Sequence, residues 1–264
     1  MTLEEAKELA AQGDLGAVCS LGDYYMLDQQ DMEEAEKWYE IAAKQDVFYA
    51  VHQLVGVERM KALAALMIAD REEIEYGWYF AGQDWQKLYD WSLKELNMIN
   101  ASVPGSETVD TDKVFKDLKD TVFHLALCNY EQRNYEKIVS LLKGIVSETR
   151  EQMLYGSAVF ETAETEQDYE YAYEMFQAVV ADNNYATATK SRHEETIYVI
   201  MTITLAGFYR EGLGERGAVP NIEKAVNVLT TIQQNLQNEK AKMIMEAELQ
   251  HYQKKIFGGY KYIK

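Results

Sequence analysis

Proline is nearly absent from this chain, which has two prolines, Pro104 and Pro220, in 264 residues. Proline breaks helices because its ring removes a backbone N–H donor and clashes with the preceding turn. Long stretches therefore carry nothing that forbids a helix, and no stretch shows the sustained alternation of β-branched residues that indicates strands. The sequence predicts an all-α fold.

Cysteine is equally scarce, and the two that occur, Cys19 and Cys128, lie in separate apolar helical patterns. We expect buried free thiols in a reducing compartment, because a disulfide framework needs more cysteines. The first ten residues form an acidic amphipathic pattern unlike a signal peptide. The longest nearly apolar stretch, residues 197–208, is too short to span a membrane. We expect a cytoplasmic protein.

Positive charge is also in short supply, with 26 lysines and arginines against 44 aspartates and glutamates, a net charge of −18. This field repels phosphate backbones and anionic lipid headgroups, so nucleic-acid and membrane-surface binding are disfavoured. Partners are expected to be basic or apolar at the contact. The exception is the basic tail, residues 251–264, which we expect to cap the last helix and pair with the acidic body.

What the sequence has in abundance is a recurring helical phrase. An oxygen-bearing residue suited to capping a helix precedes a bulky residue and an apolar pattern at five places; these residues are Asp31, Asp84, Asn134, Asp168 and Asn221. The interval from Asn134 to Asp168 is the 34 residues of one tetratricopeptide unit. The pattern predicts helices at about 2–12, 14–27, 31–44, 47–68, 71–81, 84–98, 111–132, 134–147, 149–163, 167–181, 187–211, 221–236 and 238–257.

Two segments resemble a known repeat family. Leu21-Gly22-Asp23-Tyr24-Tyr25, followed by Asp31, Ala35 and Trp38, resembles the Sel-one-like subclass of tetratricopeptide repeats. Residues 205–212, followed by Ala225, resemble the same subclass, with Ala206 where the family usually has glycine. Residues 125–138 are more similar to an ordinary tetratricopeptide repeat, whereas the spacing in 47–112 departs from the family.

The resemblance implies an α-α superhelix, a right-handed solenoid of stacked helix-turn-helix repeats. Residues 1–264 would form one solenoid of about five helix pairs and a terminal capping helix, with a hinge at 100–110. Small residues such as Gly22 and Gly156 would let paired helices approach closely. Proteins of this family usually serve as scaffolds for protein or peptide partners, without catalysis.

The resemblance also places a partner-binding groove on the concave face, at fixed offsets from the small residue of each pair. The first unit supplies Cys19, Asp23 and Met26, and the fifth includes Gly207. The candidate groove residues are Phe123, Leu127, Tyr130, Met153, Ser157, Phe160, Ile203 and Arg210. Arg210 is the one basic residue in this set, so capture of a chaperone carboxylate is not expected. A helix or peptide with apolar anchors and a basic rim suits an acidic scaffold better.

The segment 122–130 is apolar nearly all round, whereas a helix open to water should show a polar face. Either the monomer covers its second face, or the face is a patch that a partner or a second copy of the chain occupies. Both readings stay open at this point.

Catalytic and metal-binding patterns are weak. The four histidines lie on separate predicted helices, and His193-Glu194-Glu195 begins like a zincin helix but has Ile197 where the second histidine belongs. The acidic clusters sit in first turns, where carboxylates complement the helix dipole. The glycines of Gly212-x-Gly214-x-x-Gly217 follow a helix rather than a strand, which argues against a dinucleotide turn. We expect no enzyme activity, no metal and no cofactor.

The sequence thus favours a non-enzymatic, cytoplasmic, bacterial scaffold that binds a protein or peptide, and it leaves homo-oligomer formation open. The alternative is an acidic inhibitor or immunity-type protein that masks a basic surface of a partner enzyme. A third reading, a hydrolase or metal site in 69–82 or 212–220, finds no nucleophile or ligand set. Titration of a complex with salt distinguishes the scaffold from the inhibitor, because binding by charge masking weakens steeply with ionic strength.

Overall fold

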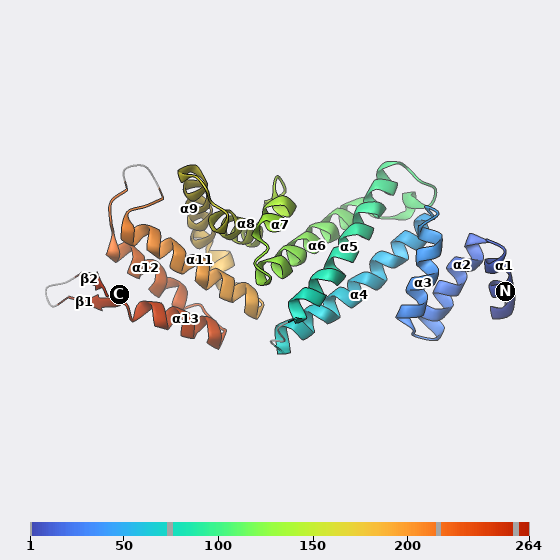
Figure 1. Cartoon of the computed structure of the whole chain (residues 1–264), viewed down its shortest axis with the longest axis horizontal. Coiled ribbons are helices and arrows are strands. Elements are labelled where there is room, and N and C mark those ends of the chain that lie inside the picture. Colours follow the sequence, from blue (N-terminus) through green and yellow to red (C-terminus); the bar gives the residue numbers. More distant parts are fainter. Residues whose placement is uncertain (1, 73–75, 215–217, 256–258, 264) are drawn as a thin grey trace. The chain divides into compact units, whose positions relative to one another are not determined.

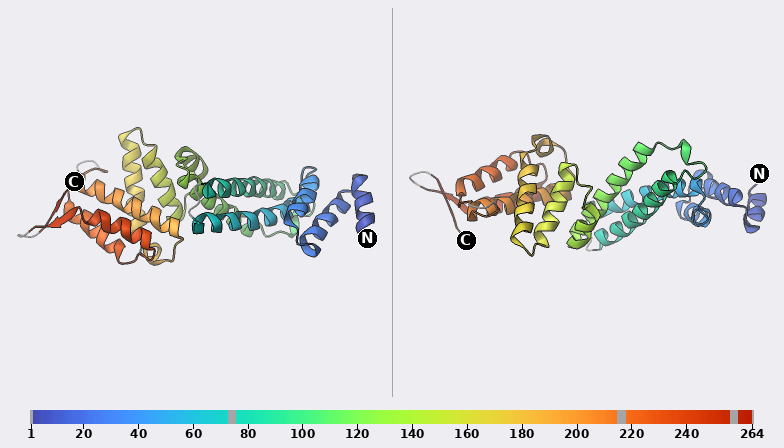
Figure 2. Two further views of the ribbon diagram at one scale, coloured as in Figure 1. Left: turned by 60° about the horizontal axis from the view of Figure 1, so that its bottom comes forward. Right: turned by 90° about the horizontal axis from the view of Figure 1, so that it is seen from above.

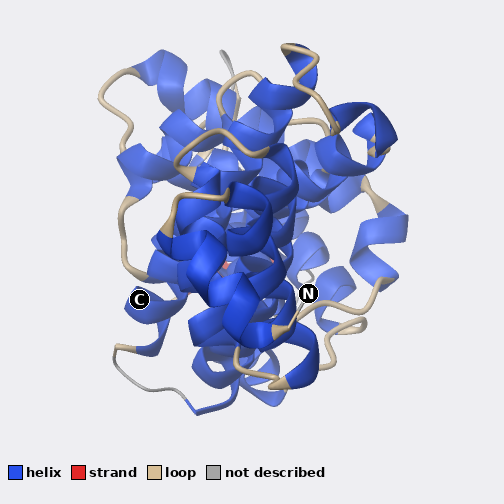
Figure 3. Cartoon of the chain, turned by 90° about the vertical axis from the view of Figure 1, so that its right-hand side faces the viewer, coloured by secondary structure: helices blue, strands red, loops and turns tan. Residues whose placement is uncertain are grey.

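The computed structural model describes residues 2–72, 76–214, 218–255 and 259–263. Thirteen α-helices and two short strands form the secondary structure of these residues (Figures 1 and 3). The predicted all-α class is confirmed, apart from the small strand pair. The chain forms two compact units, residues 1–128 and 129–264.

The first unit is a series of helices that pack each against the next from α1 to α5. The bounds are α1 Leu3–Ala11, α2 Leu15–Asp23, α3 Met32–Ala43, α4 Phe48–Glu72, α5 Gly77–Asn100 and α6 Thr111–Glu131, the last of which crosses the unit boundary. A π-helical turn follows α2 at Tyr24–Asp28. Asp31 caps α3 as predicted, since its side chain accepts a hydrogen bond from the backbone N–H of Glu34 at 3.0 Å.

The core of this unit depends on a close approach of α2 and α3. A Cβ atom at Gly22 would lie 2.4 Å from the ring of Tyr39, so only glycine leaves room for that ring. Tyr39 is buried, and its hydroxyl donates to Asp23 at 2.7 Å. The small residue therefore has the packing role that the sequence predicted for it.

One predicted boundary in this unit is wrong. Segments 71–81 and 84–98 were expected to be separate helices, but α5 runs unbroken from Gly77 to Asn100, and Asp84 lies within it. Ala81, Trp85 and Leu88 are all fully buried, so a continuous apolar stripe holds the helix together across Gly82. A glycine inside a helix costs only about 1 kcal/mol, which this burial offsets.

The second unit is organised around one long helix, α11 (Arg192–Glu211), which packs on α8, α9, α12 and α13 (Figure 2). The other helices are α7 Tyr135–Leu142, α8 Thr149–Glu161, α9 Glu166–Ala181, α10 Asn183–Thr187, α12 Ile222–Gln233 and α13 Glu239–Leu249. Asn221 caps α12 as predicted, because its side chain accepts from the backbone N–H of Lys224 at 2.8 Å.

The C-terminal segment departs from the sequence prediction. A helix was expected over 238–257, but α13 ends at Leu249, and β1 (Tyr252–Lys254) pairs antiparallel with β2 (Tyr260–Tyr262). The alternating aromatic residues explain the strands: Tyr252 is buried and meets the ring of Tyr262 edge-on at 5.0 Å. Within the described residues the tail lysines 254, 255 and 261 form no ion pair, so their expected pairing with the acidic body is not seen, and Lys264 lies outside those residues.

The structure also bears on the cysteines and on the expected hinge. Cys19 and Cys128 are buried and are not joined in a disulfide, as the sequence predicted. The segment 100–110, where a hinge was expected, lies inside the first unit and contains a 3₁₀ turn at Ser106–Thr108, while the unit boundary falls within α6. None of the helices in the described ranges is long and apolar enough to cross a membrane.

Candidate partner-binding cleft

A cleft of about 950 Å³ opens in the second unit. Its walls come from the end of α8, the start of α9 and the second half of α11, with contributions from α13 and β2. These segments are far apart in sequence, from Phe160 to Tyr262. The cleft therefore exists only once the unit is folded.

Aromatic side chains form the floor and one wall of this cleft. The ring of Phe160 meets those of Tyr169 and Phe208 edge-on, with centroid distances of 5.7 and 5.8 Å. Tyr169 is 40 % exposed and Leu213 is 56 % exposed, so two large apolar groups of the lining face solvent. Binding of a partner that covers this apolar surface would be favourable, because the surface is removed from water.

Close packing of α8 on α9 sets the position of Phe160. A Cβ atom at Gly156 would lie 3.0 Å from the Cβ atom of Met175 and 3.2 Å from the ring of Phe176, so the two helices meet at the distance that glycine allows. Phe160 lies one turn later and packs on Phe176 at 6.1 Å.

The start of α9 is held by a capping box at Thr165 and Asp168. The Thr165 hydroxyl accepts from the Asp168 N–H, and the Asp168 carboxylate accepts from the Thr165 N–H at 2.9 Å. The Asp168 carboxylate also accepts from the Thr165 hydroxyl at 2.7 Å and from the Glu164 N–H at 3.2 Å. The hydrogen bonds that the carboxylate accepts, the one from the Thr165 hydroxyl first, hold the pKa of Asp168 below its usual range. The sequence analysis placed the cap at Asp168, but the cap is Thr165, and Asp168 is the third residue of the helix. The box fixes the orientation of the neighbouring Tyr169.

Two glycines shape the other wall, where α11 ends. Gly212 has φ of +70° and terminates the helix, and Gly214 has φ of +96°. A Cβ atom at Gly214 would lie 2.4 Å from the ring of Tyr173, so that position needs glycine on two grounds. The turn places Leu213 in the cleft lining. Gly217, the third glycine of the motif, lies outside the described residues.

The cleft lining is acidic. Its carboxylates are Glu164, Glu166, Glu170, Glu211 and Glu248, and Arg210 is the one cation among the described lining residues. Arg210 is fully engaged: its Nε donates to Glu211 at 2.8 Å, and its guanidinium lies 3.7 Å from Glu248 and 3.9 Å from the ring of Tyr262. Glu164, Glu166 and Glu170, on the α9 side, form no ion pair with a residue in the described ranges.

The structure brings three of the eight predicted groove residues together: Phe160, Ile203 and Arg210 line the cleft. Four others are buried, at 2 % exposure for Phe123, 3 % for Leu127, 0 % for Met153 and 6 % for Ser157. Tyr130 is partly buried against the ring of Tyr135. Residues 122, 123 and 125–128 are buried, which agrees with the interpretation that the monomer itself covers this segment.

Sequence reasoning missed Tyr169, Glu170, Leu213 and Tyr262. Tyr169 was visible as the bulky residue of the recurring phrase, but its helical spacing suggested core packing. Leu213 stood between two glycines that already indicated a turn. Tyr262 gave no usable signal, because its place in the cleft depends on a strand pair that was not predicted.

The zincin-like residues do not converge. His193 contacts Glu131 at 3.0 Å, Glu194 accepts from the Tyr185 hydroxyl at 2.8 Å, and Glu195 accepts from the backbone N–H groups of residues 237 and 238. Three neighbouring side chains thus have three separate structural partners. No group of three or more histidine, cysteine or acidic residues in the described ranges could hold a metal ion.

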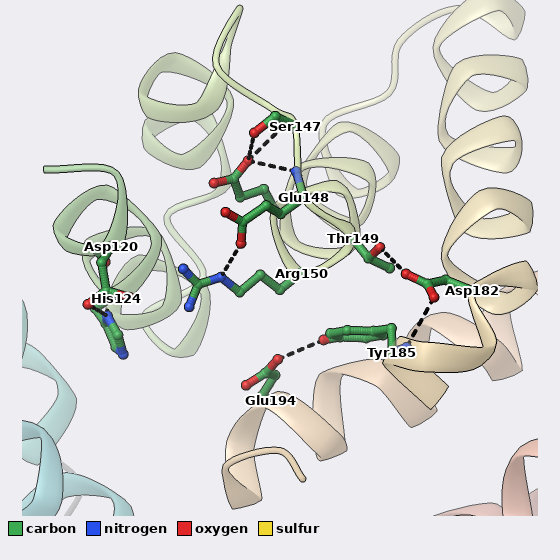
Figure 4. A network of polar contacts seen from close by, with 10 residues as sticks. Asp120, His124, Ser147, Glu148, Thr149, Arg150, Asp182, Tyr185 and Glu194 are labelled. Carbon is green, nitrogen blue, oxygen red and sulfur yellow. Dashed lines mark hydrogen bonds and ion pairs between the residues drawn. The ribbon is translucent and has the colours of Figure 1, made fainter. Parts of the chain in front are cut away.

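A polar network near the starts of α8 and α11 is also structural. Figure 4 shows the Thr149 hydroxyl directed at Asp182, and the ring of Tyr185 extended towards Glu194. Burial raises the pKa of Tyr185, which keeps its hydroxyl a hydrogen-bond donor. These contacts tie α8 and α10 to α11, and none of the residues lines the cleft.

The chain matches no family model, no curated protein and no solved structure. No family membership is therefore shown, and a functional conclusion has to stand on the cleft itself.

Proposed function

We propose that this chain is a non-enzymatic scaffold whose second unit binds a segment of a partner protein in the cleft between α8, α9 and α11. The observation that carries the proposal is a cleft of about 950 Å³ with solvent-facing aromatic and aliphatic walls at Tyr169 and Leu213. This volume is within the range of sites that enclose a ligand, and it has room for several side chains.

We further propose that the helix pairs are tetratricopeptide-like or Sel-one-like repeats that stack into a superhelix with the cleft on its concave side. Two observations support this arrangement. Neighbouring helices pack on one another from α1 to α5, from α7 to α10 and from α11 to α13. A Cβ atom at Gly22 would collide with the Tyr39 ring of the next helix, and one at Gly156 would be in tight contact with Met175 at 3.0 Å. Repeats of this kind bury their apolar faces by stacking, which leaves one face for partners.

The competing function is masking of a basic enzyme surface by the acidic exterior, without use of the cleft. The net charge of −18 is the observation in its favour. Masking predicts contacts spread over the acidic helices and a complex whose affinity falls steeply as salt is added. The affinity of an apolar contact in the cleft would change little with salt.

Site-specific photo-crosslinking tests the proposal. A benzophenone amino acid replaces Tyr169 in one variant and Ile203 in another, and the control variant carries it at Tyr171. Tyr171 is on the same helix as Tyr169 and is similarly exposed, at 44 % against 40 %, but it does not line the cleft.

We expect residues 169 and 203 to crosslink to the same protein in cells that make the chain, with little product from residue 171. Equal products from all three positions, or none from 169 and 203, would contradict the proposal.

A further inference from the structure

We infer that the segment bound in the cleft carries an arginine or lysine, and that its charged group lies between the ring of Tyr169 and the carboxylates of Glu166 and Glu170. This inference rests on the proposed function and adds the chemistry of the ligand. It is carried by the distribution of charge between the two walls of the cleft.

The α9 wall has negative charge that no described residue of the chain pairs with. Glu164, Glu166 and Glu170 all line the cleft within seven residues of one another, and within the described part of the chain none of them forms an ion pair. A cation from a partner would gain charge-assisted hydrogen bonds to these oxygens. A carboxylate brought to the same wall would be repelled.

Around Arg210, by contrast, the chain supplies its own cation. Arg210 is paired with Glu211 and Glu248, and it covers the ring of Tyr262. An anionic ligand would have to displace these contacts to reach the one cation among the described lining residues. Within that part of the lining, the α9 carboxylates are the ones that have no cation beside them, so this side favours a positively charged group.

Tyr169 supplies a face for that charge. Its ring is held at the edge of Phe160 and is 40 % exposed, next in sequence to Glu170. A cation over a tyrosine ring is stabilised by the ring quadrupole. The cleft already contains one such pair, since the guanidinium of Arg210 lies 3.9 Å from the ring centroid of Tyr262.

The remaining lining argues for a peptide rather than a small cation. Ile203, Phe208 and Leu213 add apolar surface to the lining, and a small cation would not cover it. A basic residue flanked by apolar residues covers both parts of the lining. The occupant is therefore a segment of protein with a basic residue next to apolar anchors.

A random dodecapeptide phage library panned against the full chain tests this inference. Enriched peptides are synthesised with fluorescein, and their affinities are measured by fluorescence polarisation. We expect peptides with arginine or lysine beside apolar residues. Replacement of the arginine by citrulline, or of the lysine by acetyl-lysine, removes the charge with little change of shape and is expected to weaken binding about tenfold.

A charge-matched pair of variants separates the local site from the general acidic field. Glu166→Gln with Glu170→Gln removes two cleft carboxylates, one in the first turn of α9. Glu174→Gln with Glu223→Gln removes two carboxylates outside the cleft lining, from α9 and from the first turn of α12. We expect the first double variant to bind the peptides at least threefold more weakly than the second, because exposed charge pairs contribute modestly but locally.

The outcomes distinguish this inference from the proposed function. Peptides that lose affinity with Tyr169→Ala but bind both double variants equally, or that lack basic residues, would overturn the inference and leave the cleft as the binding site. Enrichment of no peptide, or binding that Tyr169→Ala does not change, would overturn both.

Discussion

Glu58 shows at the scale of one residue how burial governs ionisation in this protein. It lies on α4 in the first unit with no solvent exposure, and Lys87 Nζ is 3.0 Å from one of its oxygens. Neither oxygen accepts a hydrogen bond from a described residue. Burial is the main cause that raises the pKa of Glu58 to about 7; Asp84 and Glu40 add to the rise, and Lys61 opposes it.

Stability of the first unit should therefore depend on pH through Glu58. An unfolded glutamate titrates near its ordinary 4.5 and the folded one near 7. Between these values the folded state holds more protons, so the free energy of unfolding falls as pH rises. Glu58→Gln removes this slope and should stabilise the protein at pH 8 by about 3 kcal/mol, with no gain below the unfolded pKa of 4.5.

Urea unfolding at several pH values measures this effect. Glu8→Gln, at an exposed position of α1, is the control and should shift stability little at any pH. A Glu58→Gln variant that is less stable than the wild type at pH 8 would show that its ion pair with Lys87 outweighs the cost of burial.

Helix boundaries show at the scale of elements what sequence can and cannot determine. The caps Asp31 and Asn221 were predictable because a local hydrogen bond defines them. Asp84 was misread because the burial of Trp85 and Leu88, which continues the helix, is a tertiary effect. The strand pair at the C-terminus was missed for the same reason, since Tyr252 and Tyr262 meet only after the chain turns back.

Helix pairing in the first unit can be tested with two glycine substitutions. Gly22→Ala places a methyl group 2.4 Å from the Tyr39 ring and should destabilise the protein by about 1–3 kcal/mol through overpacking. Gly56→Ala, in α4, meets no atom within 4 Å. It should stabilise by about 0.5–1 kcal/mol, because alanine has the better helix propensity.

Thermal and urea unfolding report both values. Equal effects of the two substitutions would show that α2 and α3 do not depend on the close approach at Gly22.

Composition and the spacing of apolar residues carried the information about fold class at the scale of the whole molecule. Scarcity of proline and the helical spacing of apolar residues predicted the all-α class correctly. The cleft could not be predicted as a unit, because its lining joins Phe160 on α8, Leu213 after α11 and Tyr262 on β2. Groove positions taken from the resemblance to a repeat family include three cleft residues, Phe160, Ile203 and Arg210. They also include Met153 and Phe123, which are buried.

Hydrogen–deuterium exchange of the full chain, with and without the tightest dodecapeptide from the library, tests the central claim most directly. A segment seated in the cleft should slow exchange in residues 160–170 and 203–214 and leave α1 to α5 unchanged. Protection confined to the first unit, or spread over the acidic helices and lost at 0.5 M salt, would contradict the assignment of the cleft as the binding site.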